Sequence, residues 1–344
     1  MSNKHIQSLF EALTPTSEQK EKMFHRILLQ SREINQRPRG VMPSRHLKTA
    51  LSIATVWIGL STTAFAAAYM GLDEAFLKFL KPANQDQMQF LSDGAYTVNE
   101  RVVHENGTLT IKQVIGDGNL TYLLMDFAAP QGTVLDAARY RFEHPMITTD
   151  QQYVSTNFEV LDDENPHDNQ ISLIMSIMSQ DPLAGQTAHF KFRDLQAAAP
   201  FPGIFETVIP GTWEADVSLN FKAYSTLYPV KRKLAMFGYE AVLQTISVSP
   251  ISITLKIESE SLKEIDQAAG RLKEIGDNEY LDHYPVTIKY QDGTSSTTSL
   301  FTGLALSDFL NGELLTIKTF EQVINEKDIA SIVFFGQEIP FRHP

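Results

Sequence analysis

The chain has 344 residues, of which 43% are hydrophobic and 20% charged, a composition typical of a protein that folds mostly in water. The absence of cysteine excludes disulfides, thiolate metal sites, iron–sulfur clusters and cysteine nucleophiles. Residues 1–48 contain nine basic and four acidic residues and carry +5, whereas the remainder contains 20 basic and 37 acidic residues and carries −17. So acidic a remainder disfavours nucleic acid as a direct partner.

Residues 1–46 are expected to form a pair of short amphipathic helices and a basic linker. Apolar side chains recur at three- and four-residue spacing in both helices, and Thr14-Pro15 can cap and begin the second one. Because two helices this short cannot bury a core of their own, their apolar faces need a partner. That partner is either a cytoplasmic protein that holds them in a groove or the inner leaflet, contacted through Arg and Lys side chains. The predicted partner-binding residues are Leu9, Phe10, Leu13, Met23, Phe24, Ile27 and Leu28.

A single membrane crossing is predicted over residues 47–72. Residues 49–72 carry no charge, and at about 1.5 Å per residue they suffice for a hydrocarbon core of about 30 Å. Arg45 and Lys48 precede this run while Asp73 and Glu74 follow it, so the N-terminus is expected in the cytoplasm and the bulk outside. The alternatives are a cleaved signal peptide, for which 48 leading residues are too many, and a buried helix of a soluble core.

Small residues recur every fourth position in the predicted membrane helix, which would let two copies of the helix approach closely. The stripe would allow a homodimer, but small residues are also common in solitary anchors. The residues are Thr55, Gly59, Thr63, Ala67 and Gly71.

Residues 73–94 are expected to form a juxtamembrane helix, over 73–81, and a linker. From residue 95 the apolar period changes to two, most clearly where Trp213, Ala215 and Val217 alternate with polar residues, and again in residues 251–257 and 286–290. Turn sequences such as Asn106-Gly107 separate these runs. Short strands with such turns predict antiparallel β-sandwiches.

Two β domains are expected, because the chain exceeds the usual span of one domain and because residues 109–127 resemble residues 241–257. Their predicted bounds are 95–225 and 226–344, with a helix inserted over residues 261–275. The fold class is therefore predicted as mainly β with N-terminal α: a short cytoplasmic helix pair, one transmembrane helix and two extracytoplasmic immunoglobulin-like antiparallel β-sandwich domains.

Catalysis has no support from motifs, since no nucleotide-binding, zinc-protease or hydrolase pattern occurs. No cofactor and no bound metal are expected. The densest polar cluster, residues 162–169, is either a solvated acidic loop or a source of oxygen ligands for Ca²⁺. It lacks the glycine and the terminal glutamate of an EF-hand loop.

Several segments together resemble a family of Gram-positive single-pass membrane proteins that are labelled anti-sigma factors and carry an ectodomain of unknown function. The segments are LTPTSEQK (13–20), NGTLTI (106–111), IGDG (115–118), YLL (122–124) and APQG (129–132). The resemblance implies that the cytoplasmic helices bind a sigma factor and that an ectodomain signal releases it.

The leading hypothesis is a membrane-anchored signalling regulator that sequesters a cytoplasmic transcription factor through its N-terminal helices. The alternative is an extracytoplasmic binding or cell-envelope structural module for which those helices are only an anchor. An exported hydrolase comes third, because its site would have to be assembled from scattered residues.

Overall fold

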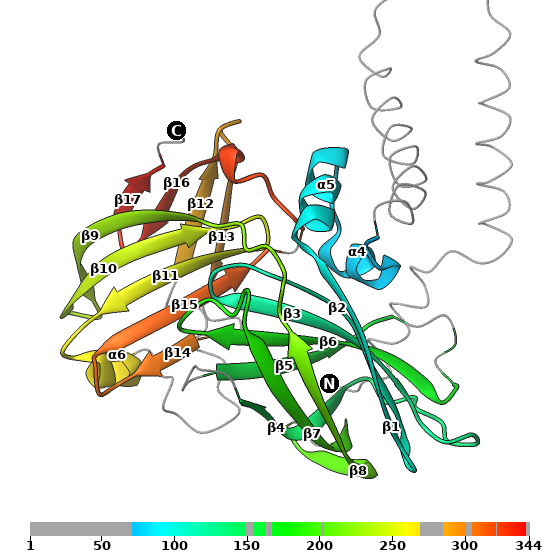
Figure 1. Ribbon diagram of the computed structural model, residues 1–344. Coiled ribbons are helices and arrows are strands. Elements are labelled where there is room, and N and C mark those ends of the chain that lie inside the picture. The colour runs from blue at the N-terminus through cyan, green and yellow to red at the C-terminus, as the bar shows by residue number, and fades with distance from the viewer. Residues whose placement is uncertain are drawn as a thin grey trace, which may run out of the picture. The chain divides into compact units, whose positions relative to one another are not determined.

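The computed structural model describes residues 71–148, 154–162, 165, 167–200, 203–268, 285–299, 305–320 and 322–341. The predicted cytoplasmic helices, and the predicted membrane segment apart from Gly71 and Leu72, lie outside these ranges. Within them, no helix has both the length and the apolar character needed to cross a membrane. The described chain is mainly β, as the alternation predicted, and its strands form several antiparallel sheets (Figure 1).

The first described helix, α4 (Glu74–Leu80), lies within residues 73–81, where the sequence predicts a helix. Asp73 caps it, because the Asp73 side chain accepts a hydrogen bond of 2.8 Å from the Ala75 amide. Lys81 ends it in the left-handed conformation, with φ of 50°. The chain then turns through Pro82, which cannot continue the helix.

A second helix, α5 (Gln85–Gly94), occupies residues that were expected to be a linker, so that part of the prediction is wrong. The Asn84 side chain caps α5 by accepting a hydrogen bond from the Gln87 amide at 3.0 Å. Met88 and Leu91 are buried on one side of the helix. Three apolar residues, Met88, Phe90 and Leu91, in a short polar segment make too weak a pattern to indicate a helix, which tertiary packing stabilises.

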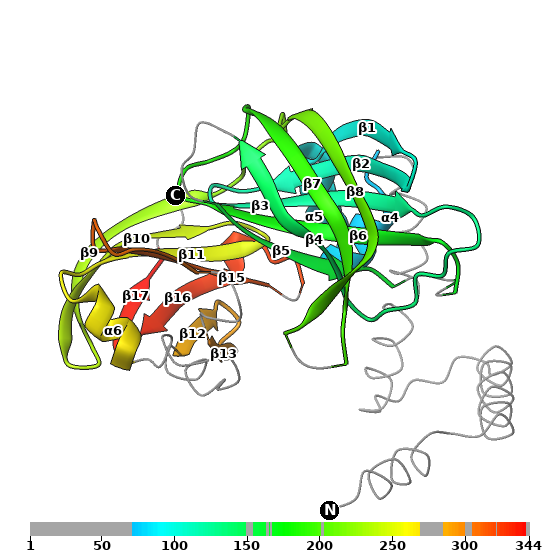
Figure 2. The same cartoon turned by 90° about the horizontal axis from the view of Figure 1, so that it is seen from below.

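Eight strands between residues 96 and 218 form a first sandwich of two antiparallel sheets. The larger sheet has the order β1-β2-β3-β6-β5 and the smaller has the order β4-β7-β8. Figure 2 shows β7 and β8 crossing over the strands of the larger sheet. The strands are β1 (Tyr96–His104), β2 (Gly107–Gly116), β3 (Leu120–Ala128), β4 (Tyr140–Thr148), β5 (Val154–Val160), β6 (Gln170–Ser179), β7 (Thr187–Ala198) and β8 (Phe205–Ser218).

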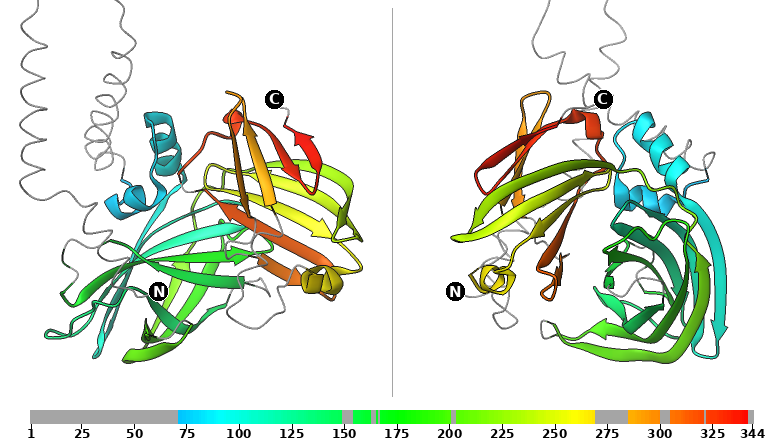
Figure 3. Two further views of the ribbon diagram at one scale, coloured as in Figure 1. Left: turned by 180° about the vertical axis from the view of Figure 1, so that it is seen from behind. Right: turned by 60° about the vertical axis from the view of Figure 1, so that its left-hand side comes forward.

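The core of this sandwich lies between its two sheets, whose strands curl around a common interior in the right-hand view of Figure 3. Trp213 on β8 is fully buried there, and its Nε1 donates a hydrogen bond of 3.0 Å to the Gly107 carbonyl. Phe127 and Phe142 meet the Trp213 ring edge-on. The predicted strand is confirmed, with Ala215 and Val217 also buried and exposed residues between them.

Residues 226–340 form a second sandwich with its own core. One sheet has the order β14-β15-β11-β10-β9 and the other has the order β13-β12-β16-β17. The helix α6 (Leu262–Ala268) is the described part of the predicted helix at 261–275, and a short 3₁₀ turn, η2 (Glu326–Asp328), precedes β16. The strands are β9 (Thr226–Met236), β10 (Tyr239–Val248), β11 (Ser252–Glu258), β12 (Pro285–Tyr290), β13 (Ser295–Ser299), β14 (Ala305–Asp308), β15 (Glu313–Thr319), β16 (Ile329–Phe334) and β17 (Gln337–Pro340).

The two sandwiches repeat one another in detail. Strands β2 and β10 each have 10 residues and each carry a bulge at the sixth, Lys112 and Gln244. Opposite each bulge the preceding strand has an extra residue with positive φ, Asn99 at 54° and Lys231 at 49°. The resemblance between residues 109–127 and 241–257 falls on these equivalent hairpins, β2–β3 and β10–β11.

Candidate functional site

Because of the bulge in β2, two successive side chains point to the same, outer face of the sheet. Ile111 points into the core, and in a regular strand Gln113 would do the same. The bulge shifts the register between Ile111 and Gln113, so that Lys112 and Gln113 both face the residues just before α4. The shift therefore creates two anchoring positions where a regular strand offers one.

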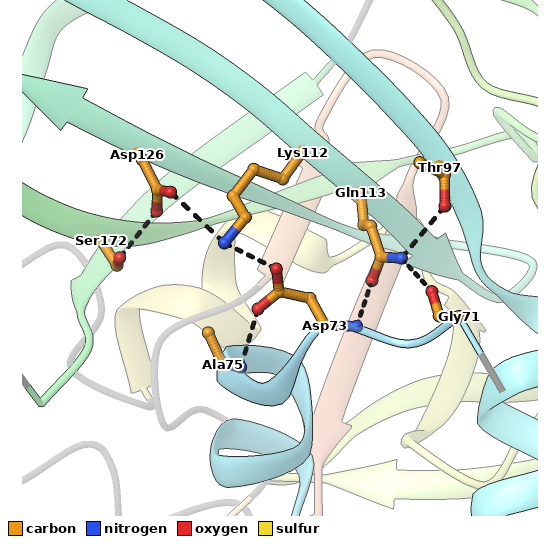
Figure 4. A network of polar contacts seen from close by, with 8 residues as sticks. All are labelled: Gly71, Asp73, Ala75, Thr97, Lys112, Gln113, Asp126 and Ser172. Atoms are coloured by element: carbon orange, nitrogen blue, oxygen red, sulfur yellow. Dashed lines mark hydrogen bonds and ion pairs between the residues drawn. The ribbon is translucent and has the colours of Figure 1, made fainter. Parts of the chain in front are cut away.

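Gln113 binds the backbone of the chain as it enters the described structure (Figure 4). Its Oε1 accepts a hydrogen bond of 2.8 Å from the Asp73 amide, and its Nε2 donates one of 2.6 Å to the Gly71 carbonyl. The same Nε2 donates to Thr97 Oγ1 at 3.1 Å. With only 5% of Gln113 exposed, its amide is nearly dehydrated, and losing these bonds would leave buried polar groups unpaired.

Lys112 joins the cap of α4 to the sheet. Its Nζ lies 2.6 Å from Asp73 Oδ2 and 3.3 Å from Asp126 Oδ2, and Ser172 Oγ donates to the other oxygen of Asp126 at 2.7 Å. Partial burial lowers the pKa of Lys112, but the hydrogen bond to Asp73 and the charges of Asp126 and Asp73 outweigh it, and the net pKa is raised. We call Gly71, Asp73, Lys112, Gln113 and Asp126 the joint.

Below the joint, a third hydrophobic cluster contains side chains from the helices and from both sandwiches. Leu72, Phe76 and Leu80 enter it from the segment around α4, and Phe76 is fully buried. The second sandwich contributes Ile251, Ile317 and Val323, and the Val323 amide donates a hydrogen bond of 3.1 Å to the Leu80 carbonyl. The first sandwich contributes Ile115, Leu120, Tyr122, Leu124, Ile174 and Met178.

A buried carboxylate connects the sandwiches beside this cluster. Asp117, in the turn between β2 and β3, is 3% exposed, and its Oδ2 accepts hydrogen bonds from Ser249 Oγ at 2.6 Å and from Ser252 Oγ. Its Oδ1 accepts from the amides of Asn119 and Leu120 at 2.9 Å. All four bonds have a charged acceptor, which makes each stronger than a neutral pair.

An open cleft of about 1200 Å³ lies beside the joint. Its lining comes from α4, from the outer face of β3, β5 and β6, and from the end of β15. Lys112 and Asp126 of the joint belong to this lining, so whatever occupies the cleft meets the residues that hold α4.

Most residues predicted as sites fall outside the described chain. Leu9, Phe10, Leu13, Met23, Phe24, Ile27 and Leu28 do so, as do Thr55, Gly59, Thr63 and Ala67. Gly71, the last residue of the small-residue stripe, is described: its φ is 75° and its carbonyl binds Gln113.

The acidic loop at residues 162–169 is described only in part. Asp168 accepts hydrogen bonds from the Gln170 amide and from Asn165 Nδ2. Across the described residues, no group of three or more His, Asp or Glu side chains is arranged to hold a metal ion.

The joint was missed by the sequence reading, although the sequence carries a signal for it. Apolar residues alternate at Leu109 and Ile111 and then resume at Val114, which is one position out of step. Such a slip indicates a bulge, and the two polar residues inside it, Lys112 and Gln113, are the ones that the bulge exposes to one face. Their partners just before α4, Gly71 and Asp73, cannot be foreseen, because they lie about forty residues away.

No protein-family model matches the chain, and no curated protein matches it either. Among solved structures, one described as the crystal structure of the conserved domain protein from Bacillus anthracis is similar to it. The similarity covers 69% of this chain and 75% of that chain, with 13% sequence identity and a TM-score of 0.46. A similarity this distant does not indicate a function.

Proposed function

We propose that the protein is a membrane-anchored signalling regulator of the anti-sigma-factor type. In this proposal its N-terminal helices hold a cytoplasmic sigma factor, residues 47–72 cross the membrane once, and the two sandwiches detect a signal in the cell envelope. Dimers form through the small-residue stripe of the membrane helix. No catalytic step is part of this function.

The joint is the observation that carries the proposal. An ectodomain that is only anchored tolerates a flexible linker, because nothing has to be transmitted through it. Here Gly71 and Asp73, at the end of the predicted membrane segment, are bonded to Lys112 and Gln113 on the sheet. A rigid connection of this kind can pass a rearrangement of the sandwiches to the membrane helix, which signalling requires.

The third hydrophobic cluster supports the same reading. Because α4 packs against both sandwiches in one cluster, a change in the contact between the sandwiches alters the packing of α4. The bond from the Val323 amide to the Leu80 carbonyl reaches the other end of the same helix. Both ends of α4 are therefore fixed to different parts of the ectodomain.

Two immunoglobulin-like domains, 95–225 and 226–344, form the sensing part in this proposal. Support comes from the separate cores and from the strand orders β2-β3-β6-β5 and β4-β7-β8, which correspond to the ABED and CFG sheets of that fold. In the second sandwich, β10-β11-β15-β14 and β13-β12-β16-β17 correspond to ABED and to CFG with one added strand. Strands β1 and β9 are extra edge strands in the equivalent place.

The test is capture of the partner by the full-length protein from membranes of its own cells after crosslinking. We expect one cytoplasmic protein that also binds core RNA polymerase. The variant Phe24→Asp should lose it, because a charge on the predicted apolar face disrupts groove binding, whereas His25→Asp on the polar face should keep it. If neither the unaltered protein nor either variant captures such a partner, the anti-sigma function is excluded.

The cleft favours a second candidate function, an extracytoplasmic binding or envelope-structure module with a simple anchor. Deleting residues 1–44 separates the two candidates. A regulator loses its effect on transcription, and a binding module retains its full envelope phenotype.

A further inference from the structure

Polar side chains from three neighbouring strands line part of the floor of the cleft. Tyr122 on β3 lies opposite Ser176 on β6, which lies opposite Asn157 on β5. Asp126 lies opposite Ser172 in another row of the same face. The buried side chains of Leu124 and Ile174 lie between these two rows. Tyr122 already bonds to Thr319, and Asp126 to Lys112 and Ser172, so the accessible polar groups are those toward β5 and the start of β6.

Unused hydrogen-bonding capacity remains on this floor. Among the described residues, the side chains of Asn157, Glu159 and Gln170 have no partner, and all three are exposed. Glu159 can only accept hydrogen bonds, whereas the two amides can both donate and accept. A ligand rich in hydroxyl groups, each both donor and acceptor, satisfies this combination.

Aromatic rings stand at two walls of the cleft. Phe79 on α4 and Phe320 after β15 both line it and are half-buried. The Phe79 ring is held in place by an edge-on contact with Tyr122, with ring centroids 5.1 Å apart. Half-buried rings that line a cleft suit ligands that alternate apolar CH faces with polar edges, as sugar rings do.

The charges and the polarity of the lining favour a neutral, polar ligand. A polyanion is disfavoured because the lining holds six carboxylates and four ammonium groups: Asp73, Glu74, Asp126, Glu159, Asp162 and Asp168 against Lys78, Lys81, Lys112 and Lys318. The attraction for a polycation is weak, because half of those carboxylates are already paired, Asp73 and Asp126 with Lys112 and Glu74 with Lys78. A wholly apolar ligand would leave the polar floor unsatisfied.

We propose that the cleft is a binding site for a neutral oligosaccharide. Its volume of about 1200 Å³ exceeds the roughly 300–1,000 Å³ of a usual small-molecule pocket, so several sugar rings fit. That this ligand is the envelope signal rests on the proposed function, whereas its binding to the cleft does not. Hydroxyl groups over Asp126 compete with Lys112 for that carboxylate, which places the ligand in contact with the joint.

Calorimetry on the full-length protein in lipid nanodiscs tests the proposal. The probes are cellotetraose, maltotetraose and the β-1,4 tetramer of N-acetylglucosamine, with tetralysine and tetraglutamate as charged comparisons. At least one tetrasaccharide should bind, and the double variant Asn157→Ala, Glu159→Ala should weaken it at least tenfold. The matched control, Glu206→Ala with Asn220→Ala, alters exposed residues away from the cleft and should bind like the unaltered protein.

Absence of heat with all three tetrasaccharides at millimolar concentration would overturn the proposal. So would preferential binding of either charged peptide, or equal affinity in the two double variants. The result is independent of the sigma-factor experiment. Captured partner without saccharide binding overturns this inference alone, and saccharide binding without a captured partner overturns the regulatory function alone.

Discussion

Asp117 accepts a 2.6 Å hydrogen bond from Ser249, which lies 132 positions further along the chain and occupies the equivalent position in the second sandwich. Both residues make the same local bonds as well. The Asp117 amide donates to the Leu120 carbonyl, and the Ser249 amide donates to the Ser252 carbonyl. Each of the two side chains accepts hydrogen bonds from the amides two and three positions further along the chain. The two turns therefore meet through residues at equivalent positions.

Replacing Asp117 by Ala should destabilise the protein by about 3 kcal/mol, because four buried donors lose their acceptor. The measurement is urea unfolding followed by the fluorescence of Trp213, in a Trp57→Phe background. Asp136→Ala removes an exposed carboxylate and should leave the midpoint unchanged. Coincident curves for the two variants would show that Asp117 does not stabilise the fold.

Two glycines with positive φ should respond differently to alanine. Gly132 has φ of 89° with open space around a new Cβ, so its replacement should cost about 1 kcal/mol of conformational strain. Gly107 has φ of 142°, and a Cβ there would lie 2.7 Å from Phe127 Cζ and 2.8 Å from the Ala128 carbonyl. Gly107→Ala should lower stability by at least about 2 kcal/mol more, by the same unfolding measurement, since the backbone oxygen cannot move aside.

Weakening the joint should loosen α4 without unfolding the sandwiches. Lys112→Gln removes the charge that pairs with Asp73, a contact worth about 1 kcal/mol for groups that remain partly exposed to solvent. Amide exchange over residues 73–80 should then accelerate about fivefold, as followed by mass spectrometry. Lys191→Gln breaks a surface pair with Glu214 and should leave that segment unaffected. Unchanged exchange in Lys112→Gln would mean that the pair does not hold the helix.

Stability should fall above about pH 10, the ordinary pKa of tyrosine, and Tyr122 should account for part of the fall. Burial raises the pKa of Tyr122 far above its usual range, and the charges of Asp117 and Glu159 add to this, while a hydrogen bond with Thr319 opposes it. The folded state therefore keeps a proton that the unfolded state releases, so the contribution is present below pH 10 and is lost as pH rises. Tyr122→Phe should show a smaller loss of unfolding free energy between pH 8 and 11 than the unaltered protein.

The β class and several individual strands could be predicted from the sequence because one face of each strand is buried against a core. Trp213, Ala215 and Val217 alternate with exposed residues as the period-two rule requires. The rule weakens in β11, where Ser252 and Thr254 are buried on the face opposite Ile253 and Leu255 because a second layer covers that face. A pattern in one strand cannot tell which layer will cover its polar face.

The site was beyond the sequence because it depends on long-range packing. Lys112 and Gln113 are visible as a break in the alternation of apolar and polar residues, but their partners in the joint depend on where α4 packs against the sheet. The same holds for Asp117, which the sequence offers as an ordinary turn residue and which the fold buries against Ser249 and Ser252. Local propensity explains each turn, and only the tertiary structure explains their meeting.

The bulge residue makes the same kind of contact in both sandwiches, but it makes a further contact in only one of them. In each sandwich the bulged side chain reaches an acidic residue at the same place on the next strand, Lys112 to Asp126 and Gln244 to Glu258. The neutral amide of Gln244 donates its hydrogen bond to Glu258 within the second sandwich. The ammonium group of Lys112 also pairs with Asp73, so in the first sandwich the residue at the bulge contacts both the next strand and the segment that precedes α4.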